Sequence, residues 1–217
     1  MIKAVIFDMD GVIIDSEPIY HKVEKKLFKR LGIKISEDEH YSFVGMSMDL
    51  IWEKILSKNK LKLNKEELIK LHTDNMIGSF QNEEKLTPLP DLIELIERFI
   101  DNDFKIALAS SSSGILIDII LKKLEIKKFF EVIISGEDVE NGKPFPDIFL
   151  LTAKHLGIKP SECLVIEDSK NGVSAAKKAD MKCIGFQNSN SGMQDLSVAD
   201  MIIDNFSALH LKDIRTL

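Results

Sequence analysis

The sequence is poor in the features that mark secreted, membrane-spanning and nucleic-acid-binding proteins. Only two cysteines occur among its 217 residues, too few for a disulfide scaffold. Cys163 and Cys183 each lie within an apolar run, and we expect both to be buried free thiols. Acidic residues outnumber basic ones by 35 to 29, and the net charge of −6 leaves no overall basic field to hold a nucleic-acid backbone. We therefore expect no nucleic-acid partner.

Long hydrophobic runs are also missing, since no stretch approaches the roughly 18–20 uncharged apolar residues that span a bilayer. The N-terminal segment MIKAVIFDMDGVIID carries Asp8 and Asp10 where a signal peptide has an unbroken apolar core, so it predicts a first strand. The composition, 44% hydrophobic and 29% charged, is that of an ordinary globular protein. These observations predict a soluble cytoplasmic protein that binds no membrane, and the lack of a long hydrophobic seam favours a monomer.

Short apolar runs alternate with helix-like stretches over most of the chain. The runs cover residues 3–7, 105–109, 132–134, 164–166, 183–186 and 201–203, and the helix-like stretches cover 92–100, 115–124, 148–156 and 173–178. Continuous apolar runs are typical of strands that are buried on both faces of a parallel sheet. The alternation predicts an α/β fold: a Rossmann-like parallel sheet with helices on both faces.

Residues 16–82 do not share this alternation. Their apolar residues, such as Val23, Leu27 and Leu31, recur at helical spacing with charged residues between them. We expect an all-helical cap domain over 16–82, inserted into an α/β core domain made of residues 1–15 and 83–217. Serine, asparagine and proline near both junctions interrupt the strand pattern of the core and the helical spacing of the insert. The lysine-rich segment 58–65 is expected to be a solvated helix end.

Polar residues follow the predicted strands, at the edge where open parallel sheets bind ligands. The strand ends contribute Asp8, Asp10, Ser110, Glu167 and Asp168, and a loop after 132–134 contributes Lys143. Each piece has an ordinary alternative, because Asp10-Gly11 is a common turn dipeptide and Ser169 or Asp168 could cap a following helix. Their combination at the ends of several strands favours a functional site.

This set of side chains suits phosphate chemistry. Carboxylates that crowd together repel each other unless a cation is bound, and all-oxygen ligands fit Mg²⁺ better than Zn²⁺. A lysine and a hydroxyl opposite the metal would complete a clamp around a phosphoryl group, and an aspartate there can become an aspartyl phosphate. Asp8 and Asp10 lie on the same side of an extended segment, so one can attack phosphorus while the other handles the proton of the leaving oxygen.

Four motifs carry a resemblance over nearly the whole chain: FDMDGV (Phe7–Val12), LASSS (Leu108–Ser112), GKPFPD (Gly142–Asp147) and VIEDSKNG (Val165–Gly172). In order and spacing they resemble the four motifs of the haloacid dehalogenase superfamily of phosphohydrolases. The segment DGVIIDSEP, followed by a helical insert, is similar to the branch with a small helical cap. That branch contains sugar-phosphate phosphatases, phosphoglycolate phosphatase-like proteins and β-phosphoglucomutase.

The resemblance implies a role for each matching residue. Asp8 would be the nucleophile and Asp10 the general acid and base. Ser110 and Lys143 would bind the transferring phosphoryl group. The implied Mg²⁺ ligands are Asp8, the backbone carbonyl of Asp10, Asp168 and Glu167, the last directly or through water. Near the substrate, the resemblance and the predicted fold place Ser111, the cap glycine Gly45 and His21.

The choice between phosphatase and mutase depends on the cap. β-Phosphoglucomutases usually carry an arginine shortly after the cap glycine, and Met48 stands at that place here. They also tend to have Lys-Asn after the serine motif and D-T-A after the first motif, where this chain has Ser113-Gly114 and Asp15-Ser16-Glu17-Pro18. A second phosphate would find no fixed cation. We expect a Mg²⁺-dependent phosphohydrolase that acts on a small phosphomonoester such as a sugar phosphate, with a β-phosphoglucomutase-type mutase as the alternative.

Two other classes are disfavoured. A phospho-signalling receiver, which is a binding switch, also combines an acidic cluster with Mg²⁺, a hydroxyl and a lysine, but receivers carry the phospho-accepting aspartate on a later strand and have no helical insert. An inactive scaffold of the same fold has little support because every catalytic position is occupied. Within the cap, His72 is expected on the surface of a helix, and Trp52 and Phe43 are expected in the cap core.

Overall fold

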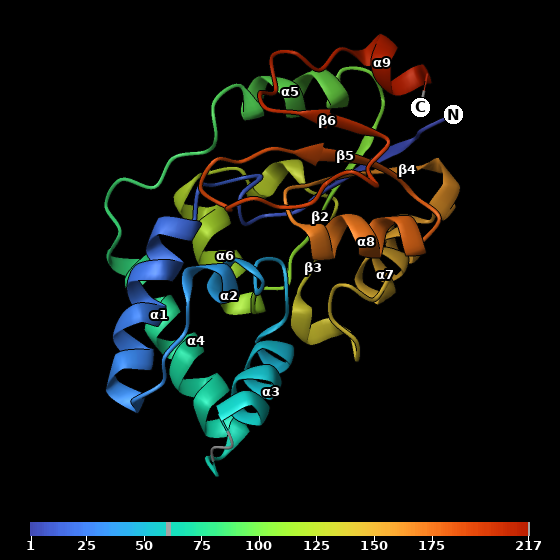
Figure 1. Cartoon of the computed structure of the whole chain (residues 1–217). Helices are drawn as coiled ribbons and strands as arrows, with labels where there is room; N and C mark the ends of the chain where they lie inside the picture. The colour runs from blue at the N-terminus through green and yellow to red at the C-terminus, as the bar shows by residue number, and fades with distance from the viewer. Residues whose placement is uncertain (60–61, 217) are drawn as a thin grey trace.

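The structure, a computed structural model, describes residues 1–59 and 62–216 (Figure 1). Within these residues six strands form one parallel sheet in the order β3-β2-β1-β4-β5-β6. The strands are β1 (Ala4–Phe7), β2 (Lys105–Ala109), β3 (Val132–Ile134), β4 (Cys163–Glu167), β5 (Lys182–Phe186) and β6 (Met201–Ile203). Every apolar run expected to be a strand is one, which confirms the α/β fold class.

Helices cover both faces of this sheet. One face packs against α5 (Leu92–Ile100), α6 (Gly114–Lys123) and α9 (Leu211–Thr216), and the other packs against α7 (Asp147–Leu156) and α8 (Lys170–Lys178). Alternate residues of β1 explain this, because Val5 and Phe7 join the first apolar cluster whereas Ala4 and Ile6 join the second. Short 3-10 turns occur at η1 (Lys127–Phe129), η2 (Gly136–Asp138) and η3 (Pro160–Glu162).

The strand order places a crevice at the carboxyl ends of β1 and β4. From β1 the chain builds outward through β2 and β3, and then it crosses back to place β4 on the other side of β1. The loops after β1 and β4 therefore leave the sheet in opposite directions, which is where open α/β sheets bind ligands. Asp8 follows β1 directly, and Asp168 follows β4.

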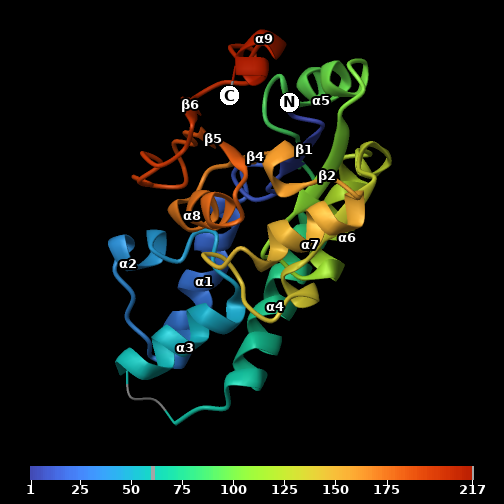
Figure 2. The same ribbon diagram turned by 90° about the vertical axis from the view of Figure 1, so that its right-hand side faces the viewer.

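The insert after β1 forms four helices: α1 (Glu17–Leu31), α2 (Glu37–Tyr41), α3 (Met48–Asn59) and α4 (Lys65–Asn82). These helices lie together in the lower part of both views in Figures 1 and 2. Helices α1, α3 and α4 share an apolar cluster of their own, in which Trp52 is fully buried and Phe43 is 5% exposed, as expected. The lysine-rich segment 58–65 lies partly outside the described residues. Of its described lysines, Lys58 and Lys62 are exposed and Lys65 is half-buried.

Both cysteines are buried and unpaired, as the sequence predicts. Burial raises the pKa of the Cys163 thiol to about 11, so this group is protonated and poorly reactive at neutral pH. Among the described residues no helix has the length and apolar character needed to cross a bilayer.

Candidate active site

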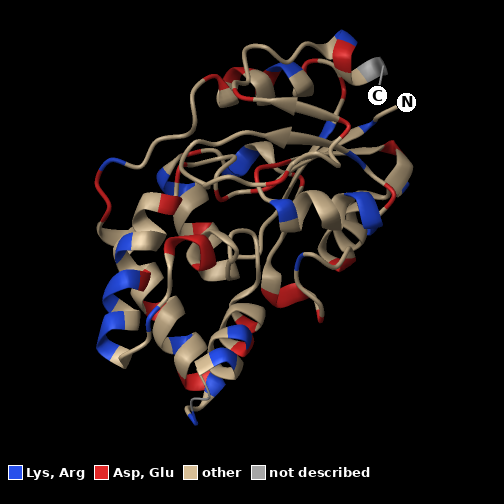
Figure 3. Ribbon diagram, viewed as in Figure 1, with Lys and Arg blue, Asp and Glu red and all other residues tan. Residues whose placement is uncertain are grey.

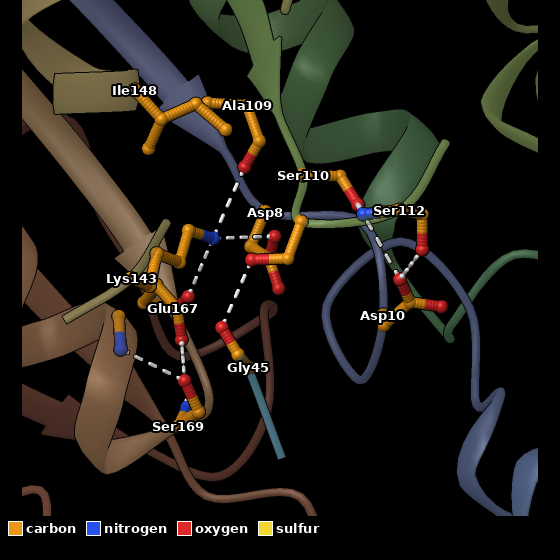
Figure 4. Close-up of polar contacts among 12 residues, drawn as sticks. Asp8, Asp10, Gly45, Ala109, Ser110, Ser112, Lys143, Ile148, Glu167 and Ser169 are labelled. Atoms are coloured by element: carbon orange, nitrogen blue, oxygen red, sulfur yellow. Dashed lines mark hydrogen bonds and ion pairs between the residues drawn. The ribbon is translucent and has the colours of Figure 1, made fainter. Parts of the chain in front are cut away.

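The centre of the site is the ammonium group of Lys143, which is fully buried. Its Nζ donates to Asp8 Oδ1 and to Glu167 Oε1, both at 2.8 Å, and to the carbonyl oxygen of Ala109 at 3.1 Å (Figure 4). These partners come from the ends of β1, β4 and β2. One cation from the loop before α7 therefore ties together three adjacent strand ends.

Burial acts on the pKa values of Asp8 and Lys143 in opposite directions. It raises the pKa of Asp8 to about 7, with further raising by Glu167 and Asp10, while the Lys143 ammonium opposes the shift. Burial would lower the pKa of Lys143, but Asp8 and Glu167 outweigh it and the pKa is raised above the usual range. Lys143 thus stays charged and holds Asp8 in place as a potential nucleophile.

Asp8, Glu167 and Asp168 form a buried cluster in which one oxygen from each carboxylate lies within 4.8 Å of the others. Asp168 Oδ2 accepts a hydrogen bond from the hydroxyl of Ser191, but its buried Oδ1 has no hydrogen-bond partner within the part of the chain that the structure describes. Burial, Glu167 and Asp8 raise the pKa of Asp168 well above the usual range. A bound cation would offset this cost, and an all-carboxylate set fits a hard divalent ion. The cluster can therefore hold a metal ion.

The local sequence explains how Glu167 is held. Ser169 caps α8 by accepting the Gly172 N–H at 2.9 Å, as one reading of the sequence expected. Its own backbone N–H and hydroxyl donate to Glu167 Oε2 at 2.7 and 2.9 Å. A Cβ on Gly172 would overlap the Glu167 carboxylate, so only glycine lets the helix start this close. The serine and glycine of VIEDSKNG thus position the glutamate.

Asp10 lies apart from the Lys143 network. Its Oδ2 accepts from Ser112 Oγ at 2.8 Å and from Ser110 Oγ at 3.4 Å, and Tyr20 OH lies 3.0 Å from Ser112 Oγ. Its Oδ1 is buried and has no hydrogen-bond partner in residues 1–59 and 62–216, and burial raises the pKa of Asp10. An aspartate with one free oxygen and a raised pKa is suited to exchange a proton with a ligand. Sequence reasoning missed Tyr20 and Ser112, although Ser112 stands in the LASSS motif.

A cavity lies between the sheet edge and the helical insert. The sheet side provides Asp8, Asp10, Ser111 and Ser112, and the insert provides Glu17, Tyr20, Glu24, His40, Phe43, Val44, Gly45, Met46, Met48 and Ile51. Two of the expected substrate residues, Ser111 and Gly45, are therefore at the cavity. His21 is not among the described residues that line it: this side chain is exposed, and its ring centroid lies 4.8 Å from that of His40. Tyr20, one residue earlier on α1, faces the cavity instead.

Segment 41–45 of the insert is docked onto the sheet domain. Ser111 Oγ donates to the carbonyl oxygen of Gly45 at 2.9 Å, and Asn171 Nδ2 donates to that of Val44 at 2.8 Å. Gln194 Nε2 donates to the carbonyl of Tyr41 at 3.0 Å. Gly45 has a φ of +76°, and a Cβ there would overlap Ser169. The structure is therefore a closed arrangement of the insert over the site.

His72 lies inside the insert, not on its surface as the sequence suggested. Its side chain is fully buried, and its ring packs edge-on against Trp52 and Phe28, with centroids 5.9 and 6.2 Å away. Its Nε2 lies 3.3 Å from Glu24 Oε1. The expectation was wrong because a lone histidine in a charged helix carries no sign of its partner. That partner, Glu24, is 48 residues away in sequence.

The parallel sheet with helices on both faces defines a Rossmann-like α/β protein, and the acidic cluster and the buried lysine mark its candidate site. The family model described as haloacid dehalogenase-like hydrolase matches residues 5–186. The chain belongs to this family.

Relatives narrow the class further. The chain is 34% identical to the phosphorylated carbohydrates phosphatase of Thermotoga maritima, over 84% of this chain and 83% of that protein. The structure of beta-phosphoglucomutase (pgmB) from Clostridium difficile superposes with a TM-score of 0.85 at 28% identity, covering 100% of this chain and 96% of that one. The chain also matches 21% of the length of protein SUPPRESSOR OF QUENCHING 1, chloroplastic, from Arabidopsis thaliana, at 32% identity over 99% of this chain. These similarities support a phosphatase, with a mutase as the alternative.

Proposed function

We propose that this protein is a Mg²⁺-dependent phosphohydrolase that releases phosphate from a small phosphomonoester through an aspartyl-phosphate intermediate. The observation that carries the proposal is the Asp8 carboxylate, fixed by a buried lysine beside two further carboxylates and open to a cavity. In this proposal residues 16–82 act as a cap domain over a core of residues 1–15 and 83–217. The closed arrangement supports this division because the cavity lies between the two parts.

The proposed mechanism assigns one step to each core residue. Asp8 attacks phosphorus in line, and Asp10 protonates the departing alkoxide and then activates the water that hydrolyses the aspartyl phosphate. Lys143 and the Ser110 hydroxyl stabilise charge on the phosphoryl oxygens. Asp8, the Asp10 carbonyl, Glu167 and Asp168 would hold Mg²⁺, which neutralises charge on the phosphate when bound.

A hydrolase acting on a carbohydrate phosphate is favoured over a mutase. The name of the Thermotoga relative points to phosphorylated carbohydrates. Met48 lines the cavity. The β-phosphoglucomutases that this chain resembles usually carry an arginine at this position. Of the described residues that line the cavity, none is lysine or arginine. The second phosphate of a bisphosphate intermediate would therefore find no lysine or arginine among these lining residues to bind it. The mutase stays the second candidate because a solved beta-phosphoglucomutase shares the fold over the full chain.

The test is phosphate release from a panel of phosphomonoesters that includes β-glucose 1-phosphate, with and without Mg²⁺, for the wild type and Asp8→Asn. We expect Mg²⁺-dependent release that is lost in the variant. Release that persists in Asp8→Asn would refute the nucleophile assignment. Conversion of β-glucose 1-phosphate to glucose 6-phosphate, supported by a trace of bisphosphate and without net phosphate release, would make the protein a mutase.

A further inference from the structure

The cap side of the cavity contains a buried carboxylate that the proposed chemistry does not use. Glu24, on α1, lines the cavity and is 4% exposed. Two histidines from other helices contact it: His40 Nδ1 lies 2.8 Å from Oε2, and His72 Nε2 lies 3.3 Å from Oε1. Although burial alone would raise the pKa of Glu24, contacts with these two histidines lower it below the ordinary value. Glu24 is therefore ionised at neutral pH.

This cluster is not saturated by its own contacts. Among the described residues, neither Glu24 Oε2 nor either ring nitrogen of His72 has an aligned hydrogen bond, although His40 Nδ1 lies 2.8 Å from that oxygen. A buried polar atom in this state costs free energy, which a ligand donor in the cavity can recover. Each oxygen of Glu24 already has one histidine contact, and a carboxylate oxygen can accept a second hydrogen bond. Since Glu24 lines the cavity, the carboxylate keeps acceptor capacity for a donor group of a bound ligand.

Glu17 adds a complementary group beside Glu24. It also lines the cavity, and its Oε2 lies 3.8 Å from His40 Nε2. Burial, with help from Asp10 and Glu24, raises the pKa of Glu17 to about 8, so its carboxyl group is mostly protonated at neutral pH. A protonated acid can donate a hydrogen bond where Glu24 accepts one. An alcohol, which both donates and accepts, matches this pair.

The charge of the cavity wall disfavours substrates that carry a second phosphate. The basic residues of α1, namely Lys22, Lys25, Lys26, Lys29 and Arg30, are exposed, and none of these five lines the cavity; α1 carries blue bands of basic residues in Figure 3. A second phosphate on the substrate would meet the Glu24 carboxylate without a compensating lysine or arginine among the described lining residues. Like charges at close range are unfavourable in a buried site, whereas a neutral hydroxyl is not.

We propose that Glu24 is a specificity-determining residue that accepts a hydrogen bond from a hydroxyl of the substrate's leaving group and disfavours substrates with a second phosphate. This assignment rests on the proposed phosphohydrolase function. His40 and His72 are positioning residues, because their ring nitrogens contact the two oxygens of the carboxylate and hold it in place. The ligand class is thus a monophosphate whose far end is an uncharged, hydroxyl-bearing group.

The test compares three substrates: glucose 6-phosphate, phenyl phosphate, whose leaving group bears no further hydroxyl, and glucose 1,6-bisphosphate. Glu24→Gln keeps the shape but removes the charge. We expect the ratio of kcat/KM for glucose 6-phosphate over phenyl phosphate to fall about tenfold, since a hydrogen bond to a charged group is worth roughly that factor or more. The ratio for glucose 1,6-bisphosphate over glucose 6-phosphate should rise. General structural damage does not produce opposite changes of this kind.

Glu37→Gln is the matched control, because Glu37 is an exposed glutamate on α2, the helix that carries His40, and it does not line the cavity. Both ratios should stay within twofold of the wild type in this variant. If Glu24→Gln does not fold, as judged by circular dichroism, His72→Gln replaces it, and the first ratio should fall at least threefold with the loss seen in KM.

The outcomes separate this inference from the function on which it rests. If the wild type releases no phosphate from any of the three substrates with Mg²⁺ present, the proposed function fails. If the wild type is active but neither Glu24→Gln nor His72→Gln changes the ratios by more than twofold, the role of Glu24 is refuted while the phosphohydrolase stands.

Discussion

At the scale of single residues, Lys143 balances two buried carboxylates. Removing it by Lys143→Met would leave Asp8 and Glu167 buried without a counter-charge. We expect the free energy of unfolding to fall by about 3–5 kcal/mol in urea denaturation of the metal-free protein. Adding Asp8→Asn to this variant should restore part of the loss, because one of the stranded charges disappears. A double variant no more stable than Lys143→Met would contradict the pairing.

The raised pKa of Glu17 predicts how the free energy of unfolding changes with pH. Its pKa is about 8 in the folded protein and near 4.5 when unfolded, so the folded state binds the proton more tightly. The stabilisation is fully present below pH 4.5 and is lost as the pH rises through 8. The free energy of unfolding of the metal-free protein should therefore decrease between pH 5 and 8, and Glu17→Gln should flatten that slope by up to about 1.4 kcal/mol per pH unit. An unchanged slope in urea titrations would rule this out.

At the scale of elements, the docking of segment 41–45 depends on Gly45. Gly45→Ala would press a methyl group into Ser169 and strain a backbone with φ of +76°. We expect kcat to fall at least about tenfold because the cap cannot close properly over the site. Gly32→Ala is the control: Gly32 also has a positive φ, +69°, but nothing lies within 4 Å of its Cβ position. It should reduce stability by about 1 kcal/mol and leave kcat unchanged.

The elements differ in how far the sequence predicts them. The inner strands β1, β2, β4 and β5 were predictable because a strand buried on both faces needs a continuous apolar run, and their residues supply one. The edge strands β3 and β6 are only partly buried, but each is also a short apolar run. The five-residue helix α2 was not predicted, since EDEHY has no apolar period and depends on its Ser36 cap. The core carboxylates could be placed together because parallel strands bring their ends to one edge.

The cap side of the site was much less predictable. Facing directions on α1 differ by about 100° between neighbouring residues, so the sequence could not decide whether Tyr20 or His21 points to the cavity. The cluster of Glu24, His40 and His72 joins three separate helices. No local sequence pattern predicts that these three side chains meet, because each residue alone is typical of a solvated helix.

At the scale of the whole molecule, metal binding should couple to folding. Mg²⁺ bound to the cluster of Asp8, Glu167 and Asp168 would relieve carboxylate repulsion that the metal-free protein bears. At a Mg²⁺ concentration of 100 times Kd, linkage predicts an increase of about 2.7 kcal/mol in the free energy of unfolding. Thermal melts with EDTA and with Mg²⁺ would measure it, and Asp168→Asn should lose most of the increase. Equal increases in both proteins would place the metal elsewhere.

Three hydrogen bonds that dock segment 41–45 onto the core end on main-chain carbonyl oxygens, those of Tyr41, Val44 and Gly45. Every amino acid carries this atom, so these three bonds do not depend on which side chains the segment displays. Val44 and Met46 line the cavity, and their side chains can therefore change by mutation while these hydrogen bonds are kept. Under the proposed function, this separation would let one scaffold change its substrate while it keeps its chemistry.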